Sequence, residues 1–265
     1  MKKNHFLISY PGNKRKECEK IYEEIKYELN DIDVIVEPFC GSCAFSYYMS
    51  IKHPKKFKYV INDTNKMLID LIELSKDENE FNIFVEKLKE LFDVTDTKEK
   101  YINVCKSAET DLLSYVYINK VYSIRAGLYP TNKVFKRESF DPMKNCPFLN
   151  FIRNENIEIT NKDALEIYEG YNKNEKALIF LDPPYLNSCN DFYQDPKLNI
   201  YEYLFNNDID SQPCKILLCL EKNWIIQLLF KNKNMIEYDK KYQPSKKDTK
   251  HLIIKNNNIN KYLNI

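Results

Sequence analysis

Apolar residues recur along the chain in short runs that stop at, or close to, an acid or a proline. Two such runs are "DVIVEPF" (33–39) and "KYVIND" (58–63), and a third is "KALIFLDPPY" (176–185). Residues 156–160 and 214–220 give two more runs of the same kind. Continuous apolar runs of this length, rich in Val, Ile and Leu, are typical of strands buried on both faces of a parallel sheet.

Stretches with helical spacing of apolar residues separate these strands. Residues 13–29 place Ile21, Ile25 and Leu29 four apart, with Asn13 as an expected N-cap. The segments 41–51, 65–75, 164–168 and 223–230 also read as helices, and two later strand-like runs cover 235–238 and 251–255. Repeated strand–helix units predict an α/β fold with a doubly wound, mainly parallel, Rossmann-like sheet.

The alternation is interrupted in the middle of the chain. The segments "EFNIFVEKLKELF" (80–92) and "DLLSYVYINKVYSI" (111–124) are helical in pattern, and a loop-like run rich in aromatic and basic residues follows. We therefore predict a helical subdomain inserted into the α/β domain. The expected boundaries are 1–75 and 151–265 for the α/β domain and 76–150 for the insertion.

Four predicted strands end at or near acids, namely Glu37, Asp63, Asp163 and Asp182. Ligands of open α/β sheets bind beyond the carboxyl ends of the strands, so these acids are candidate ligand contacts. Asp63 lies 22 residues after Gly41, a spacing typical of an acid that binds ribose hydroxyls. The loop is neither a dinucleotide G-x-G-x-x-G nor a phosphate loop, and acids line it. The pattern favours a ligand with a ribose and positive charge, such as S-adenosylmethionine, although Glu37 and Asp63 could each be a cap or a surface residue.

The stretch "LDPPY" (181–185) predicts a receptor for a planar base. Asp182 and the carbonyl group of Pro183 supply two acceptors, and the two prolines make the turn rigid. The ring of Tyr185 is expected to be exposed, and stacking of a base on it would contribute about 1–3 kcal/mol. Such a site would hold an exocyclic amino group of a base that has left its stack.

Three segments together resemble the Dam-type adenine-N6 DNA methyltransferases: "YPGNK" (10–14), "EPFCGSCAFS" with "NDTN" (37–46, 62–65), and "LDPPY". The resemblance implies methyl transfer from S-adenosylmethionine to N6 of a flipped adenine in double-stranded DNA. It implies a catalytic motif of Asp182, Pro183, Pro184 and Tyr185, and DNA contacts from Arg125, Lys133, Lys136 and Arg137. The implied cofactor contacts are Tyr10, Pro11, Gly12, Lys14, Glu37, Pro38, Phe39, Gly41, Ser42, Asp63, Asp163 and Asp182.

The chain departs from the family pattern at three places. Cys43 stands where the cofactor loop commonly has a second glycine, and Asn13 stands where a second glycine is common in the first segment. The recognition segment "RAGLYPTNKVFK" (125–136) lacks the Asn-rich pattern of many relatives. These departures concern cofactor affinity and the recognised DNA sequence rather than the choice of adenine.

Composition and charge limit the partners and the cellular location that the sequence predicts. The 265 residues carry a net charge of only +1, so DNA binding needs a local basic patch, for which 13–16 and 231–255 are candidates beside a plain solvated surface. No apolar run approaches the roughly 20 residues of a membrane helix, and the opening stretch is too short for a signal peptide. We expect a cytoplasmic protein with no membrane partner, cellular or encoded by a virus, that is a monomer or a weak dimer.

Other functions remain open on the sequence. Altered motifs are compatible with a degenerate methyltransferase fold that serves as a DNA-binding or partner subunit. Sites of the same general pattern also methylate RNA adenine or protein glutamine, although Asp182 argues against glutamine. The CxxC pair Cys40 and Cys43 has redox or zinc spacing, but no second ligand pair accompanies it, and we expect no bound metal.

Overall fold

The chain was analysed as a computed structural model that describes residues 6–8, 10, 12–95, 98–121, 136–185, 199–241 and 248–256. The strands are β1 (Val34–Glu37), β2 (Lys58–Asn62), β3 (Asn156–Thr160), β4 (Ala177–Leu181), β5 (Lys215–Glu221), β6 (Asn234–Lys241) and β7 (Asp248–Lys255). The α-helices are α1 (Cys18–Glu23), α2 (Ala44–Lys52), α3 (Lys66–Leu74), α4 (Glu78–Val94), α5 (Lys98–Ser107), α6 (Leu112–Val121), α7 (Phe148–Asn154), α8 (Ala164–Tyr171), α9 (Asn199–Asn206) and α10 (Trp224–Leu229). The 3₁₀ helices are η2 (Lys26–Asp31), η3 (Arg137–Met143) and η5 (Ile209–Ser211).

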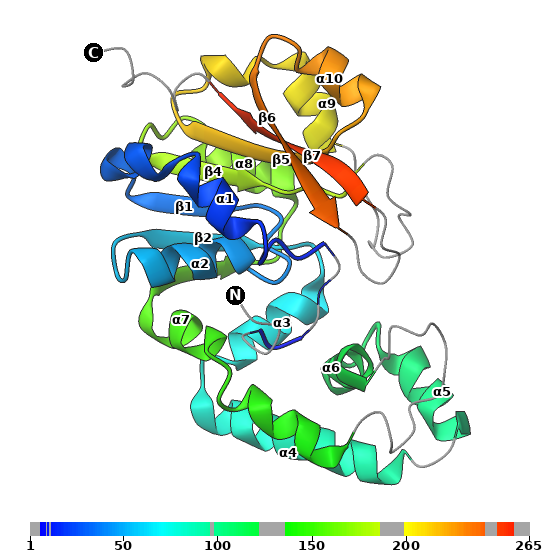
Figure 1. Ribbon diagram of the computed structural model, residues 1–265. Helices are drawn as coiled ribbons and strands as arrows, with labels where there is room; N and C mark the ends of the chain where they lie inside the picture. The colour runs from blue at the N-terminus through cyan, green and yellow to red at the C-terminus, as the bar shows by residue number, and fades with distance from the viewer. Residues whose placement is uncertain are drawn as a thin grey trace. The chain divides into compact units, whose positions relative to one another are not determined.

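The chain divides into two compact units (Figure 1). The sheet unit comprises Lys16–Thr64 and Asn156–Ile265, and the helical unit comprises Met1–Arg15 and Asn65–Glu155. The functional division at residues 75 and 150 stays a prediction. No helix within the described ranges is both long and apolar enough to span a bilayer.

All seven strands form one sheet in the order β3-β2-β1-β4-β5-β7-β6. β1 to β5 pair in parallel, whereas β7 runs antiparallel to both β5 and β6. The chain starts in the middle of the sheet, builds outward to β3, and then returns to β4 on the other side of β1. The predicted mainly parallel, doubly wound α/β fold is therefore confirmed, and its antiparallel pairs lie at one edge.

Helices cover both faces of the sheet. Neighbouring residues of one strand point to opposite faces, so the apolar side chains of a buried strand need packing partners on both sides. On one face, Phe180 of β4 stacks with Phe45 of α2 at a ring-centroid distance of 4.2 Å. On the other, Ile179 and Leu181 belong to a buried cluster with residues of α8, α9 and α10. In Figure 1, α1 and α2 lie in front of the strands and α8 lies behind them.

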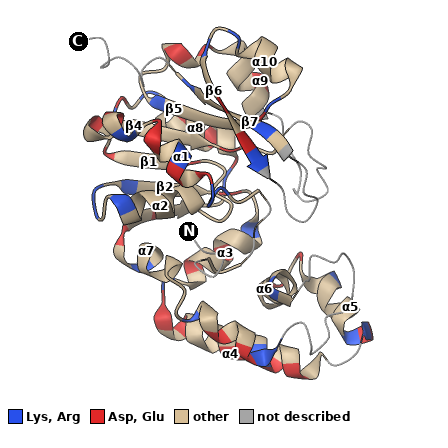
Figure 2. Ribbon diagram, in the orientation of Figure 1, with Lys and Arg blue, Asp and Glu red and all other residues tan. Residues whose placement is uncertain are grey.

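The helical unit contains α3 to α7 and η3, so the described residues of the predicted insertion are mainly helical, while its role as an inserted subdomain over 76–150 stays a prediction. Its core includes Tyr117 of α6 and Phe140 of η3, whose rings stack at 6.2 Å, with Phe92 of α4 edge-on to Phe140. Both signs of charge follow one another along α4 (Figure 2). Lys89 and Lys144 both pair with Glu86, which is consistent with a solvated helix face rather than a uniformly basic one.

The expected N-cap at Asn13 is wrong. Asn13 Oδ1 accepts a hydrogen bond from the backbone N–H of Arg15 at 2.7 Å, which makes a local turn. The helix instead begins at Cys18, with Glu17 in the N-cap position and no side-chain cap. The predicted single helix is also divided, since α1 ends at Glu23 and the tighter η2 takes over from Lys26.

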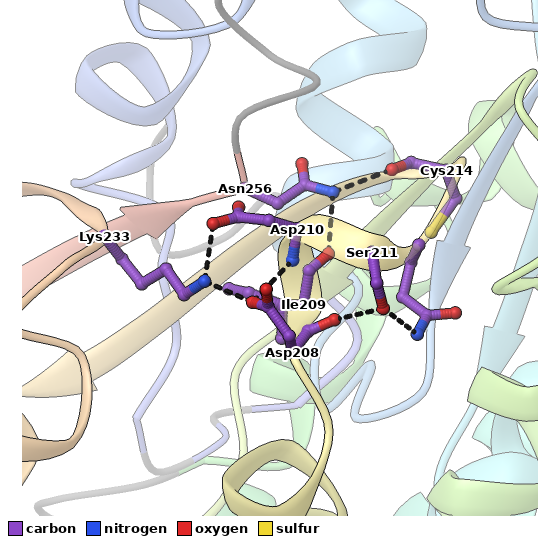
Figure 3. A network of polar contacts seen from close by, with 8 residues as sticks. Asp208, Ile209, Asp210, Ser211, Cys214, Lys233 and Asn256 are labelled. Atoms are coloured by element: carbon purple, nitrogen blue, oxygen red, sulfur yellow. Dashed lines mark hydrogen bonds and ion pairs between the residues drawn. The ribbon is translucent and has the colours of Figure 1, made fainter.

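Asn256 fastens the end of β7 to the chain that enters β5 (Figure 3). Its side-chain N–H groups donate to the carbonyl oxygens of Ile209 (3.2 Å) and Cys214 (2.9 Å), and its Oδ1 accepts from the backbone N–H of Ile216 (3.0 Å). The side chain is fully buried. Lys233, which pairs with two aspartates of the same loop, also belongs to this network.

We expect Asn256→Ala to lower the free energy of unfolding by about 2–4 kcal/mol, because it leaves several buried backbone groups without partners. Asn207→Ala is the control, since Asn207 makes one exposed hydrogen bond to the carbonyl oxygen of Tyr203. Urea unfolding of both variants measures the difference. Equal losses in the two variants would contradict a clamp at Asn256.

Candidate active site

The strand order reverses between β1 and β4, and candidate residues gather at the carboxyl ends of these strands. Glu37 is the last residue of β1, and Asp182 follows the last residue of β4. The register pairs Val36 with Ile179 and Glu37 with Ile61, so the ends of β1, β2 and β4 share one edge. Such a switch point is where open α/β sheets bind their ligands.

The loop after β1 is held against the end of β2. The backbone N–H of Gly41 donates to Asp63 Oδ2 at 2.9 Å, and that of Cys40 donates to the carbonyl oxygen of Asn62 at 2.8 Å. Gly41 has a φ of 47°, a left-handed conformation that glycine adopts without strain. Gly41 and Asp63, predicted to serve one ligand, are thus in direct contact.

Asn62 is a positioning residue that the sequence argument did not single out. Its side chain is completely buried and donates to the carbonyl oxygens of Pro38 and Lys162, both at 3.0 Å. Its Oδ1 accepts from Thr160 and from the backbone of Lys162, both at 2.8 Å. Asn62 therefore ties together the loops that leave β1, β2 and β3. Its place next to Asp63, at the end of a buried strand, was the available signal.

Glu37 is a buried carboxyl group at the centre of this edge. Only 2% of its surface is exposed, and its Oε1 accepts the backbone N–H of Ser46 at 2.6 Å. Burial raises the pKa of Glu37 to about 8; hydrogen bonding from Ser46 opposes this rise, and the charge of Asp182 adds to it. The effect of Asp182 places the two carboxyl groups within electrostatic reach of each other.

Asp163 has a defined structural role. It is the N-cap of α8, and its Oδ1 accepts the backbone N–H of Leu165 at 2.8 Å. In the same region, Asn161 donates to the carbonyl oxygen of Asp63 at 2.7 Å. The capping role of Asp163 was not predicted from the sequence, and a cofactor contact for this residue stays a prediction.

The DPPY turn follows β4 directly and is held by two tyrosine hydroxyl groups. Tyr185 donates to Asp182 Oδ1 at 3.0 Å, and Tyr201 of α9 donates to the carbonyl oxygen of Pro184 at 2.9 Å. Pro183 is buried, whereas Asp182 and Pro184 are half-buried. The motif therefore presents part of its acid at the sheet edge while its turn is fixed from α9.

The Tyr185 ring is buried rather than exposed as predicted. Only 9% of its surface is accessible, and it packs edge-to-face with His251 of β7 at a centroid distance of 5.2 Å. It also belongs to the buried cluster that includes Ile200 and Leu204 of α9. The contacts come from elements far along the chain, which a reading of the local motif could not include.

The CxxC pair consists of two buried free thiols. Burial raises the pKa of both Cys40 and Cys43, so the thiolate forms needed for redox chemistry or metal binding are disfavoured. No group of three or more His, Cys, Asp or Glu side chains arranged to hold a metal ion occurs among the described residues. These features favour a packing role for the pair.

Cys43 occupies a backbone conformation suited to glycine. It is the N-cap of α2 with φ 54° and ψ 33°, in the left-handed region. We expect Cys43→Gly to be more stable than Cys43→Ala by about 1 kcal/mol, because both lose the thiol and only alanine keeps the strain of a Cβ at this φ. Thermal and urea unfolding of the pair measures this, and an alanine variant that is the more stable would contradict the strain.

The remaining predicted cofactor contacts fall in two groups, one in the loop after β1 and one in the helical unit. Pro38 is buried and Phe39 packs on the sheet core, while Ser42 is half-buried in the loop. In the helical unit, Gly12 has a left-handed φ of 75° and its carbonyl oxygen accepts from Lys14 Nζ at 3.5 Å. The roles of Tyr10, Gly12 and Lys14 at the cofactor stay predictions, and Pro11 is outside the described residues.

The predicted DNA contacts are only partly within the described chain. Arg125 and Lys133 fall outside it. Lys136 is exposed, and Arg137 forms an ion pair with Asp93 of α4, with 2.8 Å between Nε and Oδ2. Arg137 is therefore engaged within the helical unit, and a role in DNA binding stays a prediction for all four residues.

The basic run 231–255 is not a free cationic patch over its described part. Lys233 pairs with Asp208 and Asp210, and Lys250 and Lys222 pair with Glu237. Lys240 and Lys255 pair with Glu17 and Glu24. Both signs of charge occur along β6 and β7 (Figure 2). Because these lysines are paired with acids, the run is less suited to bind DNA than a free basic patch would be.

The residues at the sheet edge fit S-adenosylmethionine. Glu37 is a buried acid at the end of β1, and a ligand bearing a sulfonium and an ammonium group would favour its charged form. Gly41 allows close approach of the ligand to the backbone, and Asp63 stands next to it. Glu37, Gly41 and Asp63 are accordingly the residues that would hold the cofactor.

The fold and this edge together define a Rossmann-like α/β protein with acids at its switch point. Comparison with known families is more specific, because the model of the D12 class N6 adenine-specific DNA methyltransferases matches residues 10–243. The chain belongs to this family, and its activity is accordingly that of an adenine-specific DNA methyltransferase. The predicted resemblance is confirmed, and dependence on S-adenosylmethionine follows from the family.

Solved structures that are similar to this chain include two of the rRNA methyltransferase aviRa from Streptomyces viridochromogenes. Each shares 10% sequence identity with this chain. One alignment covers 94% of this chain and 88% of that one, with a TM-score of 0.41. The other covers 98% and 92%, with a TM-score of 0.43. Comparison with curated proteins gives no match.

Proposed function

We propose that the protein methylates N6 of an adenine that has been flipped out of double-stranded DNA, with S-adenosylmethionine as the methyl donor. The observation that carries this proposal is the convergence of Glu37, the Gly41–Asp63 contact and Asp182 at one sheet edge. A base inside a duplex cannot present its amino group to such an edge, so it must leave the stack. The bound cofactor supplies an electrophilic methyl group, and no covalent enzyme intermediate is needed.

In this proposal Asp182 and the carbonyl group of Pro183 accept the two hydrogens of the adenine amino group. This arrangement would turn the nitrogen lone pair toward the methyl group. As the bond from N6 to the methyl carbon forms, the bond from that carbon to sulfur would break, and the proton lost from N6 would pass to the Asp182 carboxylate and on to solvent. Positioning of the two reactants then supplies most of the rate. Because Tyr185 donates to Asp182 Oδ1, it fixes the direction of the carboxylate.

The buried ring of Tyr185 modifies the proposed base pocket. A base can stack on this ring only after one of its faces is uncovered, since neighbours from α9 and β7 now surround it. We therefore assign Tyr185 two roles. It orients Asp182 before the base arrives, and it stacks on the base once the base is in place. The region 76–150, with Arg125, Lys133, Lys136 and Arg137, is proposed to contact the DNA around the target.

Incubation with tritiated S-adenosylmethionine and AT-rich genomic DNA tests the proposal, with RNA and a protein extract as parallel substrates. We expect label in DNA, and N6-methyladenine after digestion to nucleosides. Calorimetry with the cofactor distinguishes an enzyme from a degenerate subunit, which would bind no cofactor. Cofactor binding without label in DNA, or label only in RNA or protein, would overturn the proposal.

A further inference from the structure

Two of the four residues of the DPPY turn lack a backbone donor. Proline has no N–H group, so neither Pro183 nor Pro184 can donate a hydrogen bond to fix the turn. The carbonyl oxygen of Pro184 accepts instead from the hydroxyl group of Tyr201 at 2.9 Å. The donor therefore comes from a different element, α9, 17 residues further along the chain.

Tyr201 is built to hold its hydroxyl group in one place. Only 3% of its surface is exposed, and it lies in the buried cluster with Ile200 and Leu204 of the same helix. Its ring also packs against Phe205 at a centroid distance of 5.8 Å. A buried ring with a fixed orientation loses little further freedom when its hydroxyl group bonds, so it makes an effective anchor.

We infer that Tyr201 is a positioning residue for methyl transfer, acting through the DPPY turn rather than on the substrate. Its hydrogen bond fixes the peptide group between Pro184 and Tyr185. That group stands between the two parts of the proposed base receptor, namely the Pro183 carbonyl and the Tyr185 side chain, which in turn bonds to Asp182. The inference rests on the proposed function, since it deepens the account of the same site.

The neighbouring Tyr203 provides a matched comparison on the same helix. Its hydroxyl group accepts a hydrogen bond from the side chain of Asn172, at the end of α8, at 3.3 Å. Within the described part of the chain it makes no hydrogen bond to the DPPY turn. Tyr201→Phe and Tyr203→Phe therefore each remove one hydroxyl group and one hydrogen bond from α9. Only the first removes a bond to the DPPY turn.

Single-turnover methylation with saturating S-adenosylmethionine and DNA separates the two variants. We expect Tyr201→Phe to lower the rate about five- to tenfold, the effect of one lost hydrogen bond, with cofactor Kd and the DNA concentration at half-maximal rate within about twofold of the wild type. Tyr203→Phe is expected to keep the wild-type rate. Thermal unfolding reports any general loss of stability in either variant.

A donor at position 201 should restore activity. Tyr201 replaced by 4-aminophenylalanine keeps an N–H donor in place of the hydroxyl group, and we expect at least half of the wild-type rate. This variant also serves if Tyr201→Phe does not fold. Equal rates for the wild type and Tyr201→Phe, or equal losses in the Phe and 4-aminophenylalanine variants, would overturn the inference; an inactive wild type would instead overturn the proposed function.

Discussion

Asp182→Ala should reduce methyl transfer at least about 100-fold while leaving the fold in place. The expected loss follows from the position of the carboxylate, which is half-buried at the switch point and oriented by Tyr185. Removal of one preorganised polar group in an active site typically costs 10²–10³-fold in rate. The fold should survive because the hydrogen bond to Tyr185 that the variant loses is only partly buried and is worth about 1 kcal/mol.

Asp182→Asn is a milder substitution at the same position. Asparagine keeps one acceptor oxygen of similar shape, so we expect a rate between those of the wild type and Asp182→Ala. Circular dichroism and calorimetry with S-adenosylmethionine accompany the rate measurements, so that a folding or cofactor defect is recognised. An alanine variant that methylates DNA within threefold of the wild-type rate would mean that the adenine amino group is held elsewhere.

The sheet edge could be predicted from the sequence because parallel strands impose it. Short apolar runs that stop at acids identify both the strands and the edge where their carboxyl ends meet. Glu37 and Asp182 therefore appear at one switch point, and Gly41 bonds to Asp63. Each of these inferences needs only a local pattern together with a general rule of chain topology.

Residues that act through distant partners could not be predicted in this way. Asn62 connects segments 98 to 100 residues further along the chain, and Tyr201 reaches the DPPY turn from α9. Asn256 bonds to residues 40 to 47 positions earlier. Nothing local distinguishes Tyr201 from an ordinary core Tyr or Asn256 from a surface Asn, because their roles depend on which loops the sheet order brings together.

Tyr185 shows how the same limit produced an error. An aromatic residue after Pro-Pro at a strand end reads as exposed when only its chain neighbours are considered. Its burial depends on His251 of β7, which joins the sheet antiparallel to β5 near the end of the chain. Cys43 is a different case. On the sequence alone, the missing glycine was interpreted only in terms of cofactor affinity, whereas the structure shows a left-handed backbone at this position, which explains why glycine is common there.

Glu37→Gln should change both the pH dependence of stability and the affinity for the cofactor. The pKa of Glu37 is raised to about 8 from its ordinary value of 4.5, so between these values the folded chain keeps a proton that the unfolded chain has lost. The free energy of unfolding without ligand should therefore fall as pH rises through this window, by up to about 1.4 kcal/mol per pH unit. Glutamine does not titrate, so the variant should lack this decline and gain stability over the wild type toward pH 8.

Binding of a cationic ligand reverses the preference of Glu37 for its neutral form. A positive charge beside the carboxyl group lowers its pKa, so binding releases a proton below pH 8, and the affinity of the wild type for S-adenosylmethionine should rise with pH up to that point. We expect Glu37→Gln to bind at least about tenfold more weakly at pH 8.5, with little pH dependence. Calorimetry in two buffers of different ionisation enthalpy counts the released protons.

Glu158→Gln is the control for this pair of measurements. Glu158 lies on β3, is solvent-exposed, and pairs with Lys58 at 2.6 Å, away from the buried carboxyl group. It should share the wild-type stability profile and the wild-type proton release on cofactor binding. If Glu37→Gln behaves like this control in both measurements, the buried carboxyl group neither titrates in the window nor meets the positive charge of the ligand. The assignment of the cofactor to the β1 edge would then have to be abandoned, even with methyl transfer intact.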